Sequence, residues 1–518
     1  MSLTSVSFLL FAAVLLLVYY CVPKRAQWVV LLAGSWMFYL AADWRYFLFL
    51  GVTVLTAYVA TRIMGSRLQR QEAYLKENKT ALSREDKKAY KAKVKAGNRI
   101  LLTVCLAVNF GMLFVCKAAL LKPFGSGSLG FLSLGLPMGI SFYLFQTMGY
   151  VIDVYRGTVK AERCFFKLAL FSSFFPQLIQ GPISKFSQLA PQLYGQHRFE
   201  SKTVAFGLQR LLWGYFKKLV IADRIAVAVG MLKSPALGGS GFFLLTLSYA
   251  IQLYADFTGG MDMVIGLSEA MGIRLTENFR RPFFSKNIAE YWRRWHISLG
   301  EWMKDYIFYP ISVSQPMLKL SKAGRKRLGN FGKRLPVYIA SVATWFVTGI
   351  WHGLSANFIL WGMLNCFFIV LSEECQPLYE KFHGRFHLKE KPLYGIFEML
   401  RMFLLMNLIR ACDLFPRVGD YFAGLASMVT KPNFRLFTDG SMTKLGLKGL
   451  DYGILGFGIA LMLSVSIYQE TKGSVREGLG KLPWIFRYVL IFLLLTIVLL
   501  MGCYGLGYDA SSFIYNQF

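Results

Sequence analysis

Two of the five histidines have surroundings that could support acid–base chemistry. His296 lies in the run Tyr-Trp-Arg-Arg-Trp-His-Ile-Ser-Leu, and His352 lies in Thr-Gly-Ile-Trp-His-Gly-Leu. A positioned imidazole is the commonest general acid or base in enzymes, because it titrates near neutral pH. The histidines at positions 197, 383 and 387 fall in polar, basic loops, where we expect solvated roles. The pattern therefore predicts proton transfer at His352 and His296.

The position of His352 favours a functional role. If a helix begins near Pro336 at a membrane surface, His352 lies roughly 24 Å deep in a hydrocarbon core of about 30 Å. An ionisable side chain at that depth is costly and is by default a functional candidate, and burial favours the neutral ring of a general base. A histidine that only bonds a neighbouring helix stays open. Gly349 and Gly353 flank it with GxxxG spacing, which would let another backbone approach closely.

Aromatic and guanidinium groups surround His296, and they could hold a phosphate or line a channel for a donor. The group consists of Trp292, Arg293, Arg294, Trp295 and Trp302. An interfacial aromatic belt that anchors the fold is an equally open interpretation. Asp305 follows closely and is either part of this site or an ordinary ion-pair partner of a nearby arginine.

Carboxylates in apolar surroundings support a third possibility. Asp256 and Asp262 bracket Phe-Thr-Gly-Gly-Met, a glycine-broken stretch inside an apolar run. Transporters place ion sites at discontinuous helices of this kind, although no second copy of the segment occurs elsewhere in the chain. A non-enzymatic transporter therefore remains an alternative.

The amino-acid composition indicates which class of protein contains these residues. The 518 residues include 58 Lys and Arg against 28 Asp and Glu, a net charge of +30, and 55% are hydrophobic. The apolar residues form unbroken runs with the charges between them, which excludes a soluble enzyme and predicts an all-α polytopic membrane protein. The basic residues lie in loops rather than on one face, so we expect contact with membrane lipids or a phosphate-bearing donor and no nucleic acid. The eight cysteines form no CxxC pair and indicate neither disulfides nor a metal site.

Thirteen apolar runs are candidate spans, and because some are short we expect about 11 to 13 transmembrane helices in one integral membrane domain over residues 1–518. They are Ser7–Val22, Trp28–Ala42, Tyr46–Met64, Ile100–Cys116, Leu129–Tyr155, Phe165–Ile183, Val204–Ile221, Gly241–Leu267, Val337–Trp351, Leu354–Leu371, Phe397–Ile409, Tyr452–Ile467 and Ile485–Met501.

Basic connections between the runs predict the orientation. Residues 65–99 form a charged connection that we expect to be a cytosolic helix pair, since cytosolic loops collect Lys and Arg. Residues 278–335 combine a re-entrant, aromatic segment with a second basic loop, Lys319–Arg334, which has seven Lys or Arg. Non-helical backbone at membrane depth is tolerated only where protein or a wet cavity surrounds it. Residues 336–372 would then carry the catalytic histidine helices.

Several motifs together resemble the membrane-bound O-acyltransferases, in the bacterial branch that acetylates alginate or transfers D-alanine to teichoic acid. The resemblance covers roughly Ser7 to Arg410 and rests on Glu277-Asn278-Phe279, on the run Tyr291–Leu299, on Trp302-Met303-Lys304-Asp305-Tyr306 and on Gly349-Ile350-Trp351-His352-Gly353. Shorter matches are Gly139–Phe142, Asp153–Gly157, Phe175-Pro176-Gln177, Gly181-Pro182 and Asp256–Gly259.

The resemblance implies a ring of tilted helices with short re-entrant or interfacial helices around a central tunnel. It makes His352 the membrane-embedded catalytic histidine and His296 the second functional histidine. We expect Trp295, Arg294, Asp305, Trp302, Trp351, Asn278 and Asp262 to contribute to substrate binding. Holding both reactants in a dry tunnel would supply a proximity effect.

The implied reaction moves an acyl group, most simply acetyl, from a cytosolic thioester to a hydroxyl of an extracytoplasmic polysaccharide or partner protein. No bound cofactor is expected; the donor would be acetyl-CoA or an acyl carrier protein thioester. The expected partners are this donor, a secreted acyltransferase-type protein, the polysaccharide and the lipids of a bacterial inner membrane. A D-alanyl transferase fed by a carrier protein is the alternative within the same branch.

Overall fold

The computed structural model describes residues 2–119, 136–504 and 513, and within them the side chain of every residue except Ile179. The described chain is helical, and its only β pairing is one isolated bridge between Phe279 and Trp295. It divides into two compact units, residues 1–207 with 267–276, and residues 208–266 with 277–518. The division falls inside α9 (Ser201–Tyr215) and α11 (Gly238–Ala270). Whether both units form one membrane domain stays a prediction.

The first unit contains eight further helices. They are α1 (Val6–Cys21), α2 (Gln27–Leu40), α3 (Tyr46–Glu77), α4 (Arg84–Ala118), α5 (Ile140–Arg156), α6 (Phe165–Ser173), α7 (Phe175–Gln180) and α8 (Phe186–Leu193). The beginning of the predicted run Leu129–Tyr155 lies outside the described residues.

The second unit holds the remaining helices. They are α10 (Asp223–Leu232), α12 (Ile288–Arg294), α13 (Ile297–Met303), α14 (Tyr309–Ser312), α15 (Gln315–His352), α16 (Ala356–Glu374), α17 (Gln376–Phe386), α18 (Pro392–Arg410), α19 (Val418–Thr430), α20 (Gly449–Thr471), α21 (Val475–Gly480) and α22 (Trp484–Met501). Two π-helical turns are η3 (Phe216–Ala222) and η6 (Lys304–Phe308). Short 3₁₀ helices across the described chain are Lys24–Ala26, Pro235–Leu237, Pro282–Phe284, Leu388–Glu390, Ala411–Leu414, Phe434–Phe437 and Ser441–Lys444.

Seven helical segments of the described chain are long and apolar enough to cross a membrane, which confirms a polytopic membrane protein. They are Tyr46–Glu77, Arg84–Ala118, Pro235–Ala270, Ala356–Glu374, Pro392–Leu414, Gly449–Thr471 and Trp484–Met501, and Val6–Cys21 is a shorter apolar helix. The total of 11 to 13 spans and the central tunnel stay predictions.

One predicted run is not a single helix. The run Phe165–Ile183 is divided between α6 and α7 at Phe174, whose ψ of 107° is not helical. Pro176 lies at the start of α7, where its missing N–H costs nothing, but in a continuous helix it would remove a hydrogen bond. The run therefore supplies two short helices instead of one span.

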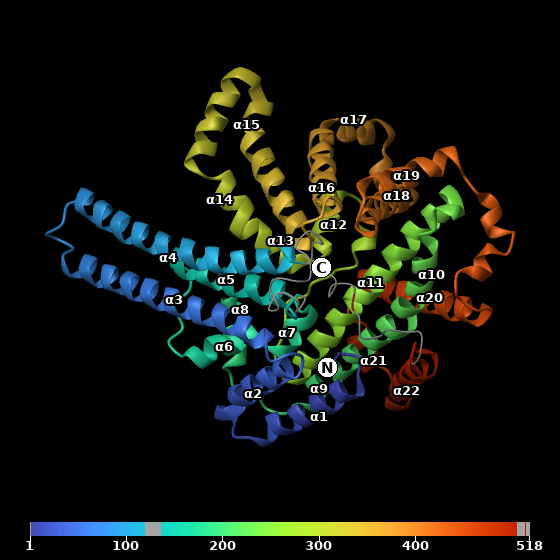
Figure 1. The fold of residues 1–518 in the computed structure, drawn as a ribbon, viewed down its shortest axis with the longest axis horizontal. Coiled ribbons are helices and arrows are strands. Elements are labelled where there is room, and N and C mark those ends of the chain that lie inside the picture. The colour runs from blue at the N-terminus through green and yellow to red at the C-terminus, as the bar shows by residue number, and fades with distance from the viewer. Residues whose placement is uncertain (1, 120–135, 505–512, 514–518) are drawn as a thin grey trace. The chain divides into compact units, whose positions relative to one another are not determined.

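The charged connection 65–99 is the predicted helix pair. α3 and α4 continue through it and lie side by side in Figure 1. Ser83 and Asp86 form a capping box at the start of α4, and the Tyr74 and Tyr90 rings meet with centroids 4.7 Å apart. The pair is held by local contacts between its two helices.

The prediction of a second basic loop at Lys319–Arg334 is wrong, because these residues are helical. α15 contains them in two legs that turn at Gly329, where φ is 59° and ψ is −133°, and Figure 1 shows the resulting hairpin. The legs meet at Gly324 and Gly332, where a Cβ on Gly324 would lie 2.6 Å from the carbonyl oxygen of Gly332. The second leg passes through Pro336 and ends at His352, so the helix that carries this histidine does not begin at Pro336.

α15 and α16 pack at glycines, as the GxxxG spacing predicts. A Cβ on Gly349 would lie 2.6 Å from the carbonyl oxygen of Phe358, and one on Gly362 would lie 2.4 Å from that of Trp345. Because the contacted atoms belong to the backbone, they cannot rotate away. The close approach fixes the end of α15, where His352 lies.

We expect Gly349→Ala to destabilise the protein by about 1–3 kcal/mol, because the added methyl group forces the two backbones apart. Thermal unfolding of the purified protein in detergent would measure the loss. Gly230→Ala on α10 is the matched control, since nothing lies within 4 Å of its added Cβ. Equal midpoints for the two variants would contradict the packing argument.

Candidate active site

A short antiparallel pairing brings Asn278 beside His296. The Arg280 N–H donates to the Arg294 carbonyl at 2.9 Å, and the Ile297 N–H donates to the Asn278 carbonyl at 3.0 Å. The Asn278 Oδ1 accepts from the Ser298 N–H at 3.0 Å and from its hydroxyl at 2.9 Å, and lies 3.3 Å from His296 Nδ1. This fully buried amide therefore orients both the start of α13 and the imidazole.

His296 occupies a strained and dry position. Its φ of 47° and ψ of 53° are left-handed, a conformation that non-glycine residues adopt rarely and that often occurs at functional sites. The side chain is buried against the Phe257 ring, with centroids 5.0 Å apart. Burial lowers the pKa of His296 to about 3, and the nearby Arg410 charge acts in the same direction. The ring is therefore held in its neutral form at physiological pH.

The Trp351 ring packs against both predicted catalytic histidines. Its ring centroid is 5.9 Å from that of His296 and 4.8 Å from that of His352. Both histidines are buried, with His296 2% and His352 8% exposed. The structure thus brings His296 to the indole next to His352, although 56 positions separate the two histidines in the sequence.

His352 is enclosed by aromatic rings. The Trp361 ring meets it edge-on with centroids 4.7 Å apart, and the Phe358 ring stacks at 6.4 Å. Both rings come from α16, which approaches because of the glycine contacts described above. The ring of His352 therefore points into the protein and not toward lipid.

Trp295 is buried under a guanidinium that the sequence analysis missed. Arg410 lies with its guanidinium carbon 4.0 Å from the Trp295 ring centroid and donates to the Tyr291 hydroxyl at 2.9 Å. Arg410 is only 4% exposed and ends the apolar helix α18. An arginine in an apolar run is a functional-site signal, and that signal could have identified it.

Arg294 faces carboxylates. It pairs with Glu290 at 2.7 Å and with Glu470 at 2.9 Å, so these two anions already occupy its guanidinium. Trp302 is buried on α13 with its ring centroid 5.1 Å from that of Tyr306, and Asp305 is half-buried on the π-helical turn η6. Roles for these three residues in substrate binding stay predictions.

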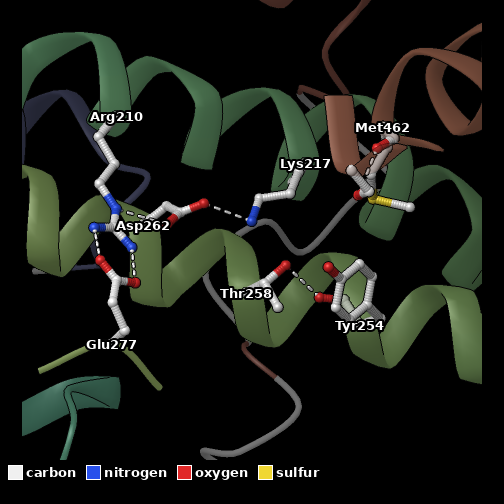
Figure 2. A network of polar contacts seen from close by, with 8 residues as sticks. Arg210, Lys217, Tyr254, Thr258, Asp262, Glu277 and Met462 are labelled. Atoms are coloured by element: carbon white, nitrogen blue, oxygen red, sulfur yellow. Dashed lines mark hydrogen bonds and ion pairs between the residues drawn. The ribbon is translucent and has the colours of Figure 1, made fainter. Parts of the chain in front are cut away.

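Asp262 belongs to an ionic network on α11, shown in Figure 2. Its carboxylate accepts from Arg210 at 2.8 Å and from Lys217 at 2.6 Å, and Arg210 also binds Glu277 with two bonds of 2.6 Å. The four side chains carry two positive and two negative charges.

Asp256 belongs to a second, deeper group. Lys218 binds both Asp256 and Asp223 at 2.8 Å, and Lys218 and Asp256 are 1% and 2% exposed. α11 is continuous through Gly259, so the broken helix predicted for a transporter is wrong. Gly259 instead lets α9 approach, because a Cβ there would lie 3.0 Å from the Gly214 carbonyl oxygen.

The arrangement can transfer a proton in a water-poor setting. It offers two buried imidazoles that pack against one indole, one of them oriented by an amide, which suits general base chemistry on a hydroxyl. No group of three His, Cys, Asp or Glu among the described residues could hold a metal ion. Arg280 and Arg281 line a cavity that Asn278 also borders, and guanidinium groups of this kind could bind the phosphate of an acyl donor.

Comparison with known families supports the same chemistry. Residues 164–324 and 326–414 match the model of the MBOAT, membrane-bound O-acyltransferase family, and these ranges contain both histidines.

Individual relatives point to the bacterial branch. The chain is 39% identical over 230 residues to a probable alginate O-acetylase of Pseudomonas syringae pv. tomato, covering 44% of this chain and 41% of that protein. It is 33% identical over 371 residues to one of Azotobacter vinelandii, covering 69% and 66%. It is 27% identical over 254 residues to a teichoic acid D-alanyltransferase of Bacillus subtilis, covering 48% and 61%. The chain thus spans less than half the length of the first relative and about two thirds of the second.

Proposed function

The chain belongs to the membrane-bound O-acyltransferase family, and we propose that it transfers an acyl group, most simply acetyl, from a cytosolic thioester to a hydroxyl beyond the membrane. The observation that carries this proposal is the pair of buried imidazoles that both pack against the Trp351 ring. Transfer of an acyl group needs a base for the hydroxyl in water-poor surroundings, and this buried pair offers one.

His352 acts as the general base. The hydroxyl oxygen attacks the thioester carbonyl carbon while the imidazole of His352 accepts the hydroxyl proton. The carbon–sulfur bond then breaks, and the leaving thiolate receives a proton. His296, held by Asn278, orients the thioester or relays that proton. Trp351 and Trp295 exclude water around both rings.

The donor is acetyl-CoA or an acyl carrier protein thioester, and no cofactor stays bound. The acceptor is a hydroxyl of an extracytoplasmic polysaccharide, reached directly or through a secreted acyltransferase-type partner protein. Such a path requires a multi-pass protein in the bacterial inner membrane. The identity of 33% to 39% with alginate O-acetylases supports acetyl as the group transferred.

A D-alanyl transferase fed by a carrier protein is the second candidate. Its specific support is the similarity to the teichoic acid D-alanyltransferase, which has a lower identity of 27%. The same base and the same proton transfers would serve both acyl groups, so the two candidates differ only in donor and acceptor.

Mass analysis of cell-surface glycans tests the proposal. Cells without this chain should lose acetyl esters that return when the wild-type chain is restored and do not return with His352→Gln. Loss of D-alanyl esters in place of acetyl esters would select the second candidate. Glycans unchanged in all three strains would refute acyl transfer to a polysaccharide.

A further inference from the structure

Asn365 is a buried amide inside the apolar helix α16, and the sequence analysis gave it no role. The residue is 0% exposed. Its Oδ1 accepts a hydrogen bond from the Nε1–H of Trp292 on α12 at 3.2 Å, and its Nδ2 donates to the Trp361 carbonyl of its own helix at 2.8 Å. A polar side chain inside a candidate membrane span is costly unless it is bonded, and it is by default a functional candidate.

The chemistry of the two partners fixes the orientation of this amide. An indole nitrogen only donates and a backbone carbonyl only accepts, so the oxygen of Asn365 faces Trp292 and its nitrogen faces the Trp361 carbonyl. Leucine has the same branched shape as asparagine but could make neither bond. The amide therefore supplies a directed link between α12 and α16 that apolar packing alone would not.

The two tryptophans connect this link to both histidines. The Trp361 ring lies edge-on to His352, with centroids 4.7 Å apart. The Trp292 ring meets the Trp361 ring at 5.7 Å, and Trp292 belongs to the short helix α12, which ends two positions before His296. Asn365 therefore bonds the helix that precedes one imidazole to the helix that encloses the other.

We propose that Asn365 is a positioning residue for the acyl transfer proposed above, so the inference rests on that function. Its bond to Trp292 holds α12 and α16 in the relative position at which both imidazoles meet the Trp351 ring. Asn365 acts through the two tryptophans and takes no part in proton transfer. Because a displacement of about 1 Å at a reacting group can lower a rate about 100-fold, loss of this bond should lower kcat and leave KM nearly unchanged.

Thioester turnover by the purified Asn365→Leu protein measures the effect. We expect kcat to fall about 10- to 100-fold, with the KM for the thioester within about twofold of the wild-type value. Asn109→Leu on α4 is the matched control, because this buried amide also donates to the carbonyl four residues before it, at 2.9 Å, and bonds Thr56 of α3. The control should lower the thermal midpoint in the same way and leave kcat unchanged. A similar fall in kcat in both variants would show lost stability alone and overturn the inference.

A double-mutant cycle tests whether the effect passes through Trp292. Trp292→Phe keeps an aromatic ring but removes the N–H, so it should reproduce most of the fall in kcat. Adding Asn365→Leu to Trp292→Phe should then lower kcat by less than about threefold more, because the shared bond is already lost. Losses that multiply as independent effects would contradict a role through this tryptophan.

The pH profile of Asn365→Asp separates positioning from packing. A neutral carboxyl group can accept from Trp292 and donate to the Trp361 carbonyl, as the amide does, whereas a carboxylate cannot donate. The kcat of this variant, divided by that of the wild type at each pH, should approach one at low pH and fall as the carboxyl group ionises. A ratio that rises with pH would overturn the inference.

The wild-type protein measured beside these variants separates this inference from the proposed function. Absence of acyl transfer by the wild type would refute the proposed function and the role of Asn365 with it. Acyl transfer by the wild type with an unchanged kcat in Asn365→Leu would overturn the positioning role alone.

Discussion

Replacing His352 by alanine is expected to lower the rate of acyl transfer by about 10² to 10⁴, the usual contribution of a general base. The hydroxyl would then have to lose its proton to water, which the aromatic cage of Trp351, Phe358 and Trp361 excludes. The rate of thioester loss with purified protein and a model hydroxyl acceptor measures the effect.

His352→Gln is a second variant of the same residue, in which the glutamine side chain still fills the space between the aromatic rings. A loss of rate in this variant therefore cannot be explained by collapse of the end of α15. His383→Ala is the matched control, since this histidine of the same unit bonds Tyr394 away from the cage. His296→Ala should act differently and raise the KM for the thioester more than it lowers kcat. Wild-type turnover in both His352 variants would remove this residue from the mechanism.

Replacing Lys218 by methionine is expected to cost about 3–5 kcal/mol of stability. Methionine keeps the length of the side chain but removes the charge that Asp256 and Asp223 share. Two carboxylates would then be buried close together without their cation. The thermal midpoint and the yield of monodisperse protein in detergent measure the loss.

Lys233→Met is the control, because this lysine is exposed at the end of α10 and carries the same charge. Adding Asp256→Asn to Lys218→Met should recover part of the lost stability, since it removes one uncompensated charge. A double variant less stable than the single one would show that the ion pair is not the source of the effect.

Hydropathy predicted most of the fold, because a helix in lipid must satisfy its own backbone and therefore appears as a long apolar run. The runs around α11, α16, α18, α20 and α22 became helices near the predicted bounds, whereas α3 and α4 extend beyond their apolar runs into the charged helix pair. Hydropathy does not predict where individual proline and glycine residues divide, turn or continue a helix, and there the structure differs from the predicted runs. Examples are the division at Phe174, the hairpin turn at Gly329 and the continuous helix through Gly259.

The candidate site was predicted in part. Motif types identified His296, His352, Trp351, Trp295 and Asn278, and the structure gathers these in the second unit. The sequence could not pair Arg410 with Trp295, because 115 positions separate them and the contact depends on how α18 packs. It also could not reveal that Asp262 and Arg294 are already paired with charged neighbours.

The π-helical turn η3 places consecutive lysines against two different acids on α11. Lys217 reaches Asp262 and Lys218 reaches Asp256, although π-helical backbone is rare and survives only where its surroundings offset its weaker bonding. The turn therefore tolerates little change in length, because shortening it by one residue would rotate both ammonium groups away from their partners. Insertions and deletions should accumulate on either side of residues 216–222 and spare the turn itself.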